Sequence, residues 1–214
     1  MKITIIYDNT TFSPKLEADW GFSCLVKGNR IPTILFDTGG NGEILLSNMK
    51  NLEIDPRKID LVFISHHHYD HTGGLSAFLN QNNQVALYLP PSFRGVRNAR
   101  KIVHVAGPGL IADHVYSTGE LEGIEQSMVL KTEKGLVLVT GCSHPFMGDI
   151  LSRASAFGRV YAVVGGLHGF RDFELFAEMK LICAVHCTQY REELKALYPD
   201  RVVPGGAGYT LTFS

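Results

Sequence analysis

Short apolar runs separated by polar turns dominate the pattern along this chain. The runs are rich in Val, Ile, Leu and Phe and have the length and composition of β-strands. Such strands are predicted at residues 3–7, 20–26, 33–36, 60–64, 85–89, 101–105, 114–117, 128–132, 136–140, 160–164, 202–203 and 209–213, with a short apolar segment at 184–185. The first three follow one another through short turns, which favours an antiparallel or mixed sheet over a simple repeat of βα units.

Amphipathic segments between the later strands predict helices. In residues 43–52, for example, Ile44, Leu45 and Met49 share one helical face. The predicted helices cover residues 43–52, 75–79, 149–157, 173–181 and 191–197. Strands that alternate with helices indicate an α/β (α+β) chain. No internal repeat, low-complexity segment or linker interrupts it, so a single domain over residues 1–214 is expected.

A histidine or aspartate follows several of the predicted strands directly. This arrangement occurs at Asp37, at residues 66–71, at His144, at His168 and at His186. Strand-end residues of α/β proteins converge at one edge of the sheet, where ligands usually bind. These side chains are therefore expected to form one site.

The densest of these segments is residues 65–74, with four histidines and one aspartate within six consecutive positions. Imidazole and carboxylate groups are ligands for Zn²⁺, Fe and Mn. His66 and His68 are two apart and would point to one side of an extended backbone. Asp70 and His71 would then face a second position. Two ions about 3.5–4 Å apart can share a water and lower its pKa, so the spacing predicts a dinuclear metal site.

Two ions need further ligands, and the later strand ends offer them. We assign His66, His68 and His144 to one ion, and Asp70, His71 and His186 to the other. His168 is left open between a supporting contact, a substrate contact and a ligand.

Cys142 lies two residues before His144. Its thiolate could bind metal, although the sequence favours a small buried residue at a strand end.

The composition of the chain limits the binding partners and the compartment that can be expected. The net charge of −1 gives no support to binding of nucleic acid or an anionic membrane. No apolar run approaches the roughly 18 residues needed to span a bilayer, and the beginning of the chain becomes polar too soon for a signal peptide. The four cysteines form no Cys-x-x-Cys pair. A reducing cytoplasm is the expected compartment.

Several of these motifs together resemble the metallo-β-lactamase superfamily of metal-dependent hydrolases. They are Asp37-Thr38-Gly39 and residues 65–74, which contain the His-x-His-x-Asp-His run. Together with residues 8–10, 20–23, 140–144, 165–168 and 186–188 they resemble the branch of dihydropterin-ribofuranosyl-aminobenzene-phosphate-synthase-like proteins. The resemblance implies a four-layer αββα sandwich of two mixed sheets flanked by helices. It places metal ligands at His66, His68, Asp70, His71, His144 and His186, and a supporting buried carboxylate at Asp37.

The chain departs from the superfamily pattern at one ligand position. A bridging aspartate is usual between the third and last histidine motifs, and no clear equivalent is present. Cys142, Asp149 and His168 are the nearby candidates. Gln189 also stands where this branch is expected to have a glycine.

The leading hypothesis is a metal-dependent hydrolase with two zinc ions, for which Fe or Mn are alternatives. A metal-bound bridging hydroxide would attack a small-molecule ester, lactone or phosphoester, with a phosphorylated substrate preferred. Asp70 and His168 are the predicted catalytic residues: Asp70 would orient the nucleophile, and the residues around His168 would contribute substrate contacts. Two alternatives remain: a synthase-like transferase in pterin-cofactor biosynthesis, and a non-hydrolytic iron, redox or metal-binding protein with the same ligands.

Overall fold

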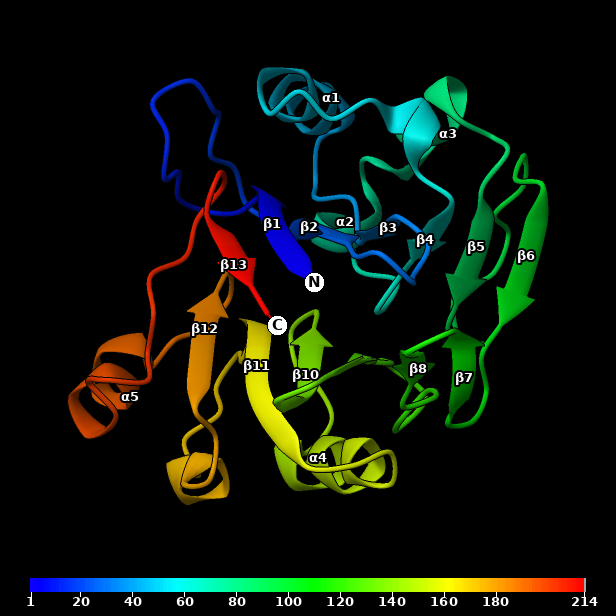
Figure 1. The fold of residues 1–214 in the computed structure, drawn as a ribbon. Coiled ribbons are helices and arrows are strands. Elements are labelled where there is room, and N and C mark those ends of the chain that lie inside the picture. The colour runs from blue at the N-terminus through cyan, green and yellow to red at the C-terminus, as the bar shows by residue number, and fades with distance from the viewer. Residues whose placement is uncertain (214) are drawn as a thin grey trace.

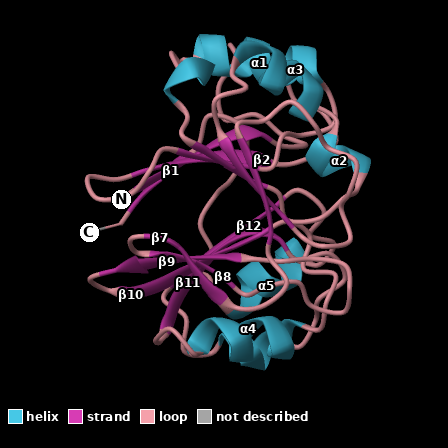
Figure 2. Ribbon diagram, turned by 90° about the vertical axis from the view of Figure 1, so that its right-hand side faces the viewer, coloured by secondary structure: helices cyan, strands magenta, loops and turns pink. Residues whose placement is uncertain are grey.

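Two β-sheets face each other and helices cover the outer face of each sheet (Figures 1 and 2). The computed structural model describes residues 1–213. The layers follow the order helix, sheet, sheet, helix, which confirms the four-layer αββα sandwich expected from the sequence.

The first sheet has seven strands in the order β13-β1-β2-β3-β4-β5-β6. The strands are β1 (Lys2–Tyr7), β2 (Ser23–Lys27), β3 (Ile34–Phe36), β4 (Leu61–Phe63), β5 (Ala86–Leu89), β6 (Lys101–His104) and β13 (Thr210–Thr212). Pairing is antiparallel from β13 to β3 and parallel from β3 to β6. The sheet is therefore mixed, as the hairpin-like start of the chain predicts.

The second sheet has six strands in the order β12-β11-β10-β9-β8-β7. The strands are β7 (Gly109–Ala112), β8 (Val115–Ser117), β9 (Met128–Thr132), β10 (Gly135–Thr140), β11 (Val160–Gly166) and β12 (Leu181–Val185). The last three pair in parallel and the others are antiparallel. Parallel β10, β11 and β12 consequently end at the same edge.

Both faces of the strands are buried, which explains their nearly continuous apolar runs. In β10, Val137 and Val139 belong to the core between the sheets. Leu136 and Leu138 alternate with them and face the helices on the other side. The same alternation in β4 turns Phe63 inward between the sheets, and period-2 geometry accounts for it.

Helices cover the outer faces of both sheets. On the first sheet lie α1 (Gly42–Asn51), α3 (Leu75–Gln81) and the short 3₁₀ helix η1 (Pro56–Lys58); on the second lie α4 (Met147–Ser155), α5 (Arg191–Leu197) and η2 (Phe173–Phe176). A short helix, α2 (Tyr69–Thr72), lies within the histidine-rich segment. The side chain of Asn41 caps α1 by accepting hydrogen bonds from two of its first N–H groups.

Two predicted elements differ from the structure, and one strand was not predicted. The helix expected at 173–181 is wrong, because η2 ends at Phe176 and Lys180 already bonds to the neighbouring strand at Tyr161. Residues 202–203 form only a single bridge with Ile182 instead of a strand. A strand, β7, covers residues 109–112, for which no element was predicted. For the first two, pairing with a distant partner decided the outcome, and the local pattern does not contain that information. β7 instead pairs with β8, the strand that follows it.

The architecture brings the ends of the parallel strands to one end of the sandwich. In Figure 2 the chain termini lie at one end, and α2, which follows β4, lies at the other. None of the helices described in residues 1–213 combines the length and the apolar character needed to cross a bilayer.

Candidate metal centre

Three strand ends bring five histidine rings together. His66 and His68 follow β4, His144 follows β10 and His186 follows β12. Ring centroids of His66 lie 4.2 Å from His71, 4.6 Å from His68 and 4.9 Å from His144, and those of His71 and His186 are 4.9 Å apart. The six positions assigned as ligands from the sequence therefore meet in one place, with Asp70 beside His186.

The backbone at these strand ends adopts an unusual conformation. Asp37, Ser143, His168 and His186 have φ values of 51°, 60°, 43° and 48°. Non-glycine residues rarely occupy this left-handed region, and it costs free energy that the surrounding structure must supply. Four of the eight non-glycine residues with positive φ in the described part of the chain lie at these strand ends, and such strain is found at many functional sites.

Asp37 lies behind the histidine cluster and is completely buried. Its carboxylate accepts hydrogen bonds from the Ser65 amide at 2.7 Å and the Ser65 hydroxyl at 2.6 Å. It also lies 2.7 Å from Nδ1 of His71. A carboxylate on Nδ1 fixes the imidazole so that Nε2 faces the centre, which is the supporting position that the family resemblance gave to Asp37.

His66 and His186 are also held through Nδ1. The Ser65 hydroxyl lies 2.9 Å from Nδ1 of His66, and the Asn9 side-chain oxygen lies 3.0 Å from Nδ1 of His186. The Nε2 atoms of His66, His144 and His186 are buried and make no hydrogen bond. Buried polar atoms are nearly always paired, so three buried nitrogens that make no hydrogen bond fit metal ligands.

The protonation states agree with this arrangement. Burial and the neighbouring His71 hold the pKa of His66 far below its ordinary value. Burial and the adjacent His68 lower the pKa of His144 to about 4, and burial also lowers the pKa of His186. All three imidazoles are therefore neutral near pH 7, the form that binds metal.

Asp70 and His71 complete the other half of the centre. The Asp70 carboxylate lies 3.2 Å from Nε2 of His186 and 3.8 Å from Nε2 of His71. Burial would raise the pKa of Asp70, but the close His186 and His71 imidazoles outweigh it and lower the pKa. Burial would lower the pKa of His71, but the Asp37 carboxylate outweighs it and raises the pKa. Asp70 is thus ionised, as a metal ligand must be.

Cys142 occupies the middle of the cluster. It is only 3% exposed, and its Sγ lies 3.1 Å from Nε2 of His71. Two sets of possible ligand atoms are present; within each set all atoms lie within 4.8 Å of one another, and Cys142 belongs to both. The sets are Asp70, His71, Cys142 and His186, and His66, Cys142 and His144. The expectation of a small buried residue at a strand end describes its burial but not this central place.

The remaining predicted residues lie around these two sets. The His68 ring, at the exposed side, lies 4.7 Å from that of His144. The His168 ring is exposed and lies 5.0 Å from that of His144. His67 is exposed, as expected for a residue between ligands. Asp149 is exposed on α4 and belongs to neither set.

Glu125 is a functional candidate that the sequence analysis missed. It is 1% exposed and accepts four main-chain hydrogen bonds from the segment after β10. One oxygen accepts from Gly141, Cys142 and Ser143 at 3.0, 3.0 and 3.1 Å, and the other accepts from His144 at 2.9 Å. Burial raises the pKa of Glu125, and these N–H groups act in the opposite direction. Glu125 therefore sets the shape of the segment that carries Cys142 and His144.

Asp8 and Asn9 have a similar role beneath His186. Asp8, directly after β1, accepts a hydrogen bond from the His186 amide at 2.7 Å. Asn9 donates from its side-chain amide to the His186 carbonyl at 3.1 Å. The sequence did contain a signal for Asp8, because it is a polar residue directly after an apolar strand. β1 runs parallel to β3 and therefore ends at the same edge of the sheet.

The chain contains one tryptophan, and it borders the centre. Trp20 is 58% exposed, although its ring lies 5.1 Å from that of His186. A large apolar ring left exposed beside a cluster of polar groups is a common feature of ligand sites. The segment before β2 therefore contributes to the entrance of the centre.

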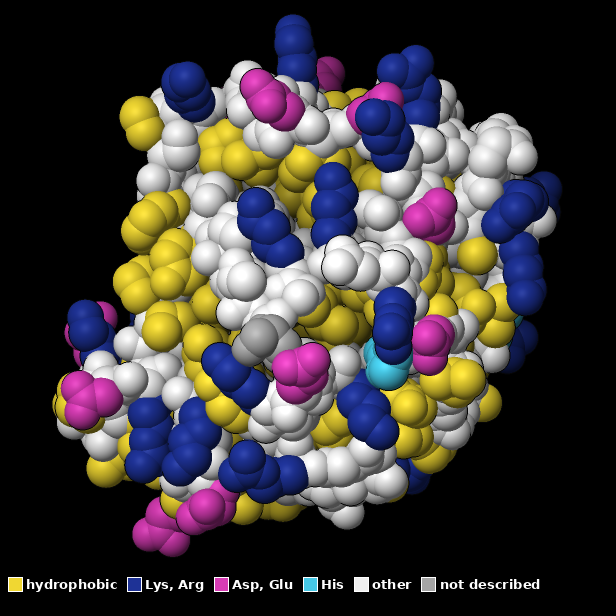
Figure 3. Space-filling model, in the orientation of Figure 1, with side chains coloured by type: hydrophobic (Ala, Val, Ile, Leu, Met, Phe, Trp, Pro, Cys, Tyr) yellow, Lys and Arg dark blue, Asp and Glu magenta, His cyan; other side chains and the backbone are white. Residues whose placement is uncertain are grey.

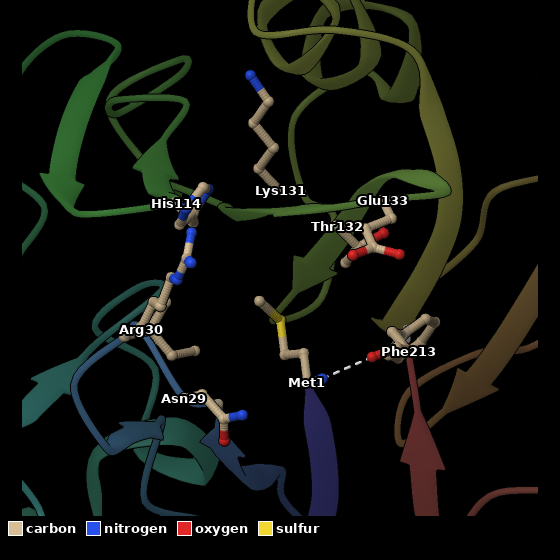
Figure 4. A pocket seen from close by; sticks show the side chains of 10 residues that line it. Met1, Asn29, Arg30, His114, Lys131, Thr132, Glu133 and Phe213 are labelled. Carbon is tan, nitrogen blue, oxygen red and sulfur yellow. Dashed lines mark hydrogen bonds between the residues drawn. The ribbon is translucent and has the colours of Figure 1, made fainter.

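The opposite end of the sandwich has a separate cavity. It has a volume of about 540 Å³ and is lined by residues that include Arg30, His114, Thr132 and Glu133 (Figure 4). On this face Lys and Arg side chains are interspersed with Asp and Glu (Figure 3). None of the residues assigned to the metal centre lines this cavity.

Comparison with known proteins gives consistent results. A family model described as the metallo-beta-lactamase superfamily matches residues 22–144. A relative from Methanocaldococcus jannaschii, named 7,8-dihydropterin-6-methyl-4-(beta-D-ribofuranosyl)-aminobenzene-5'-phosphate synthase, is 28% identical over 258 aligned residues. The alignment covers 89% of this chain and 88% of that protein.

Solved structures resemble the whole chain. The structure of Tm1679, described as a metal-dependent hydrolase of the beta-lactamase superfamily, has a TM-score of 0.78 and 25% sequence identity, covering 99% of this chain and 98% of that one. The metallo-beta-lactamase fold protein YhfI from Bacillus subtilis has a TM-score of 0.72 and 15% identity, with 98% of each chain covered. The second likeness concerns the fold alone.

Proposed function

Since the chain belongs to the metallo-beta-lactamase superfamily, we propose that it is a metal-dependent hydrolase acting on a small-molecule ester, lactone or phosphoester. One observation carries the proposal: three buried imidazole Nε2 atoms that make no hydrogen bond lie in the same cluster as an ionised carboxylate and a buried thiol. Strained backbone and buried polar atoms without hydrogen bonds destabilise the metal-free protein, and binding of a metal would offset that destabilisation.

Two metal ions are the proposed occupants, with zinc as the preferred metal and Fe or Mn as alternatives. His66, His68 and His144 would hold one ion, and Asp70, His71 and His186 the other. When bound, such ions activate water and stabilise negative charge that develops on the substrate. The neutral imidazoles and the ionised Asp70 are already in the protonation states that this binding needs.

The chain's own residues supply orientation and proton transfer. Asp70 is the ionised carboxylate within the centre and would accept a hydrogen bond from the attacking water. His168 is exposed and its ring lies beside that of His144. It is therefore placed to contact the substrate or to give a proton to the leaving group.

The proposed substrate is a small molecule, with a phosphorylated one preferred. A near-balanced charge gives no electrostatic attraction for a nucleic acid. Trp20 at the entrance would pack against an apolar part of the substrate. No partner protein is needed to complete the ligand set, since all its members come from one chain.

Metal-dependent turnover tests this proposal. The purified protein would be stripped with a chelator, reconstituted with Zn²⁺, and assayed against phosphodiester, phosphomonoester, lactone and thioester substrates. We expect hydrolysis of at least one class that disappears on metal removal and returns on reconstitution. His144→Ala should lose this activity and His114→Ala, a histidine at the opposite cavity, should keep it. Activity that survives in metal-free protein would contradict the proposal.

A synthase-like transferase is the second candidate. The specific observation in its favour is the relative named as an aminobenzene-phosphate synthase, which aligns with 89% of this chain. Incubation of the zinc-loaded protein with a pterin and a ribosyl-aminobenzene phosphate, followed by mass spectrometry, would detect a condensed product. Such a product without hydrolysis in the substrate panel would favour the transferase.

A further inference from the structure

One sulfur atom is common to both halves of the proposed metal centre. The two sets of ligand atoms are separate except for Cys142, and within each set all atoms lie within 4.8 Å of one another. The carboxylate in these sets, that of Asp70, belongs to only one of them. The Cys142 sulfur is therefore the atom placed where two ions would both reach it.

A purely structural role leaves this arrangement unexplained. A thiol has one proton and can satisfy one nitrogen, and His71 at 3.1 Å would take it. The Nε2 atoms of His66 and His144 would still be buried without a partner, and that of His186 would have only the Asp70 carboxylate, at 3.2 Å. A shared metal-bound thiolate allows all four nitrogens to be ligands.

The surrounding structure fixes the sulfur in this place. Glu125 accepts a hydrogen bond from the Cys142 amide at 3.0 Å, and from the amides on both sides of it. A Cβ atom at Gly141 would overlap the Ser65 hydroxyl, so the close contact between the ends of β10 and β4 requires glycine there. Cys142 is thereby held against the segment that carries His66 and His71.

We propose that the Cys142 thiolate is the shared ligand that bridges the two metal ions. The inference rests on the proposed metal centre, and it deepens it by naming the bridging group. A thiolate has several lone pairs and can bind two ions at once, and it favours borderline and soft metals such as zinc over Mg²⁺ or Ca²⁺. The thiol loses its proton when the metal binds.

Cobalt substitution tests this directly, because Co²⁺ bound to a thiolate gives a sulfur-to-metal charge-transfer band in the near ultraviolet. The stripped full-length protein would be titrated with CoCl₂ while absorbance and bound cobalt are recorded. A bridging thiolate predicts a band that grows through both the first and the second equivalent. A band that reaches its full intensity after one equivalent would show a terminal ligand and overturn the inference, as would wild-type protein that binds two equivalents without the band.

Variants identify the sulfur. Cys142→Ser should lose the band, whereas Cys187→Ala should keep it, although the Cys187 thiol lies 3.9 Å from the Cys142 carbonyl oxygen. Cys142→Asp should bind two cobalt ions without the band, since a carboxylate can also bridge. A band retained in Cys142→Ser would contradict the assignment.

The result is distinguishable from failure of the proposed function. Wild-type protein with the two-step band but no hydrolysis of any substrate would retain the bridge and reject the hydrolase. Hydrolysis by a protein whose two bound cobalt ions give no band would support the hydrolase and reject the bridge. Wild-type protein that binds no cobalt would reject the bridge.

Discussion

Glu125 offers the most quantitative test of how the centre is built. Its buried carboxylate accepts four main-chain hydrogen bonds at 2.9–3.1 Å from Gly141 through His144. Glu125→Ala would leave four N–H groups without their acceptor, at about 1–3 kcal/mol for each that stays buried and unpaired. Removal of the buried charge offsets part of this cost. We expect a net loss of about 3–5 kcal/mol in the free energy of unfolding, as for one partner removed from a buried charged pair.

Glu125→Gln keeps the size of the side chain and removes its charge, so it separates the two contributions to stability. Glu125→Gln keeps one oxygen acceptor, but its NH₂ group would face the donor N–H of His144. We expect this variant to lose about 1–3 kcal/mol, the cost of one unpaired buried donor. It should also bind metal more weakly by about 10–100-fold, the range seen when the supports of metal ligands are changed.

Urea unfolding of the metal-free protein, followed by circular dichroism, gives the free energies. Competition with a chromophoric chelator gives the metal affinities. Glu122→Gln is the matched control, because Glu122 accepts a hydrogen bond from the Phe146 amide at 3.1 Å but is exposed. The control should change stability by less than about 0.5 kcal/mol. A Glu125→Ala variant as stable as this control would refute the reasoning.

Three further predictions concern the residues that surround the ligands. Asp37→Asn should lower metal affinity by about 10–100-fold while the fold survives, since it weakens the carboxylate support of His71; unchanged affinity in chelator competition would contradict it. Binding of Co²⁺ should quench the fluorescence of the single tryptophan, because Trp20 lies 5.1 Å from the His186 ring; a cobalt titration without quenching would place the ion elsewhere. The metal-free protein should lose stability as the pH falls from 7 to 5. Burial lowers the folded-state pKa of His66 and His186 below the unfolded value of about 6.5, so the unfolded chain binds more protons there and the free energy of unfolding falls. Urea unfolding at pH 7 and pH 5 measures this change, and equal midpoints would count against it.

The fold could be predicted from the sequence to the extent that it depends on local patterns. Strands of a doubly covered sheet are apolar on both faces, so runs such as residues 136–140 stand out directly. The helix predicted at 173–181 was wrong, because an amphipathic pattern contains no information on the hydrogen bond between Lys180 and Tyr161. Strand order and pairing depend on distant partners and were not predicted; the family resemblance supplied only the αββα sandwich of two mixed sheets.

The residues of the candidate site also fall into those that the local sequence predicts and those that it does not. Four of the assigned ligands lie within six consecutive positions, so their density alone indicates a metal site: His66, His68, Asp70 and His71. Glu125 gives no local signal, since a lone glutamate in a polar segment is usually exposed. Its role exists only where the segment before β9 meets the end of β10.

The central claim is that these strand ends form one metal centre. Elemental analysis by inductively coupled plasma mass spectrometry, after the stripped protein is reconstituted with Zn²⁺ and dialysed, tests it most directly. We expect two zinc ions per chain in the wild-type protein and one or fewer after His66→Ala or His186→Ala, each with the fold retained by circular dichroism. Wild-type protein without bound zinc, or two zinc ions still bound in both variants, would contradict the account.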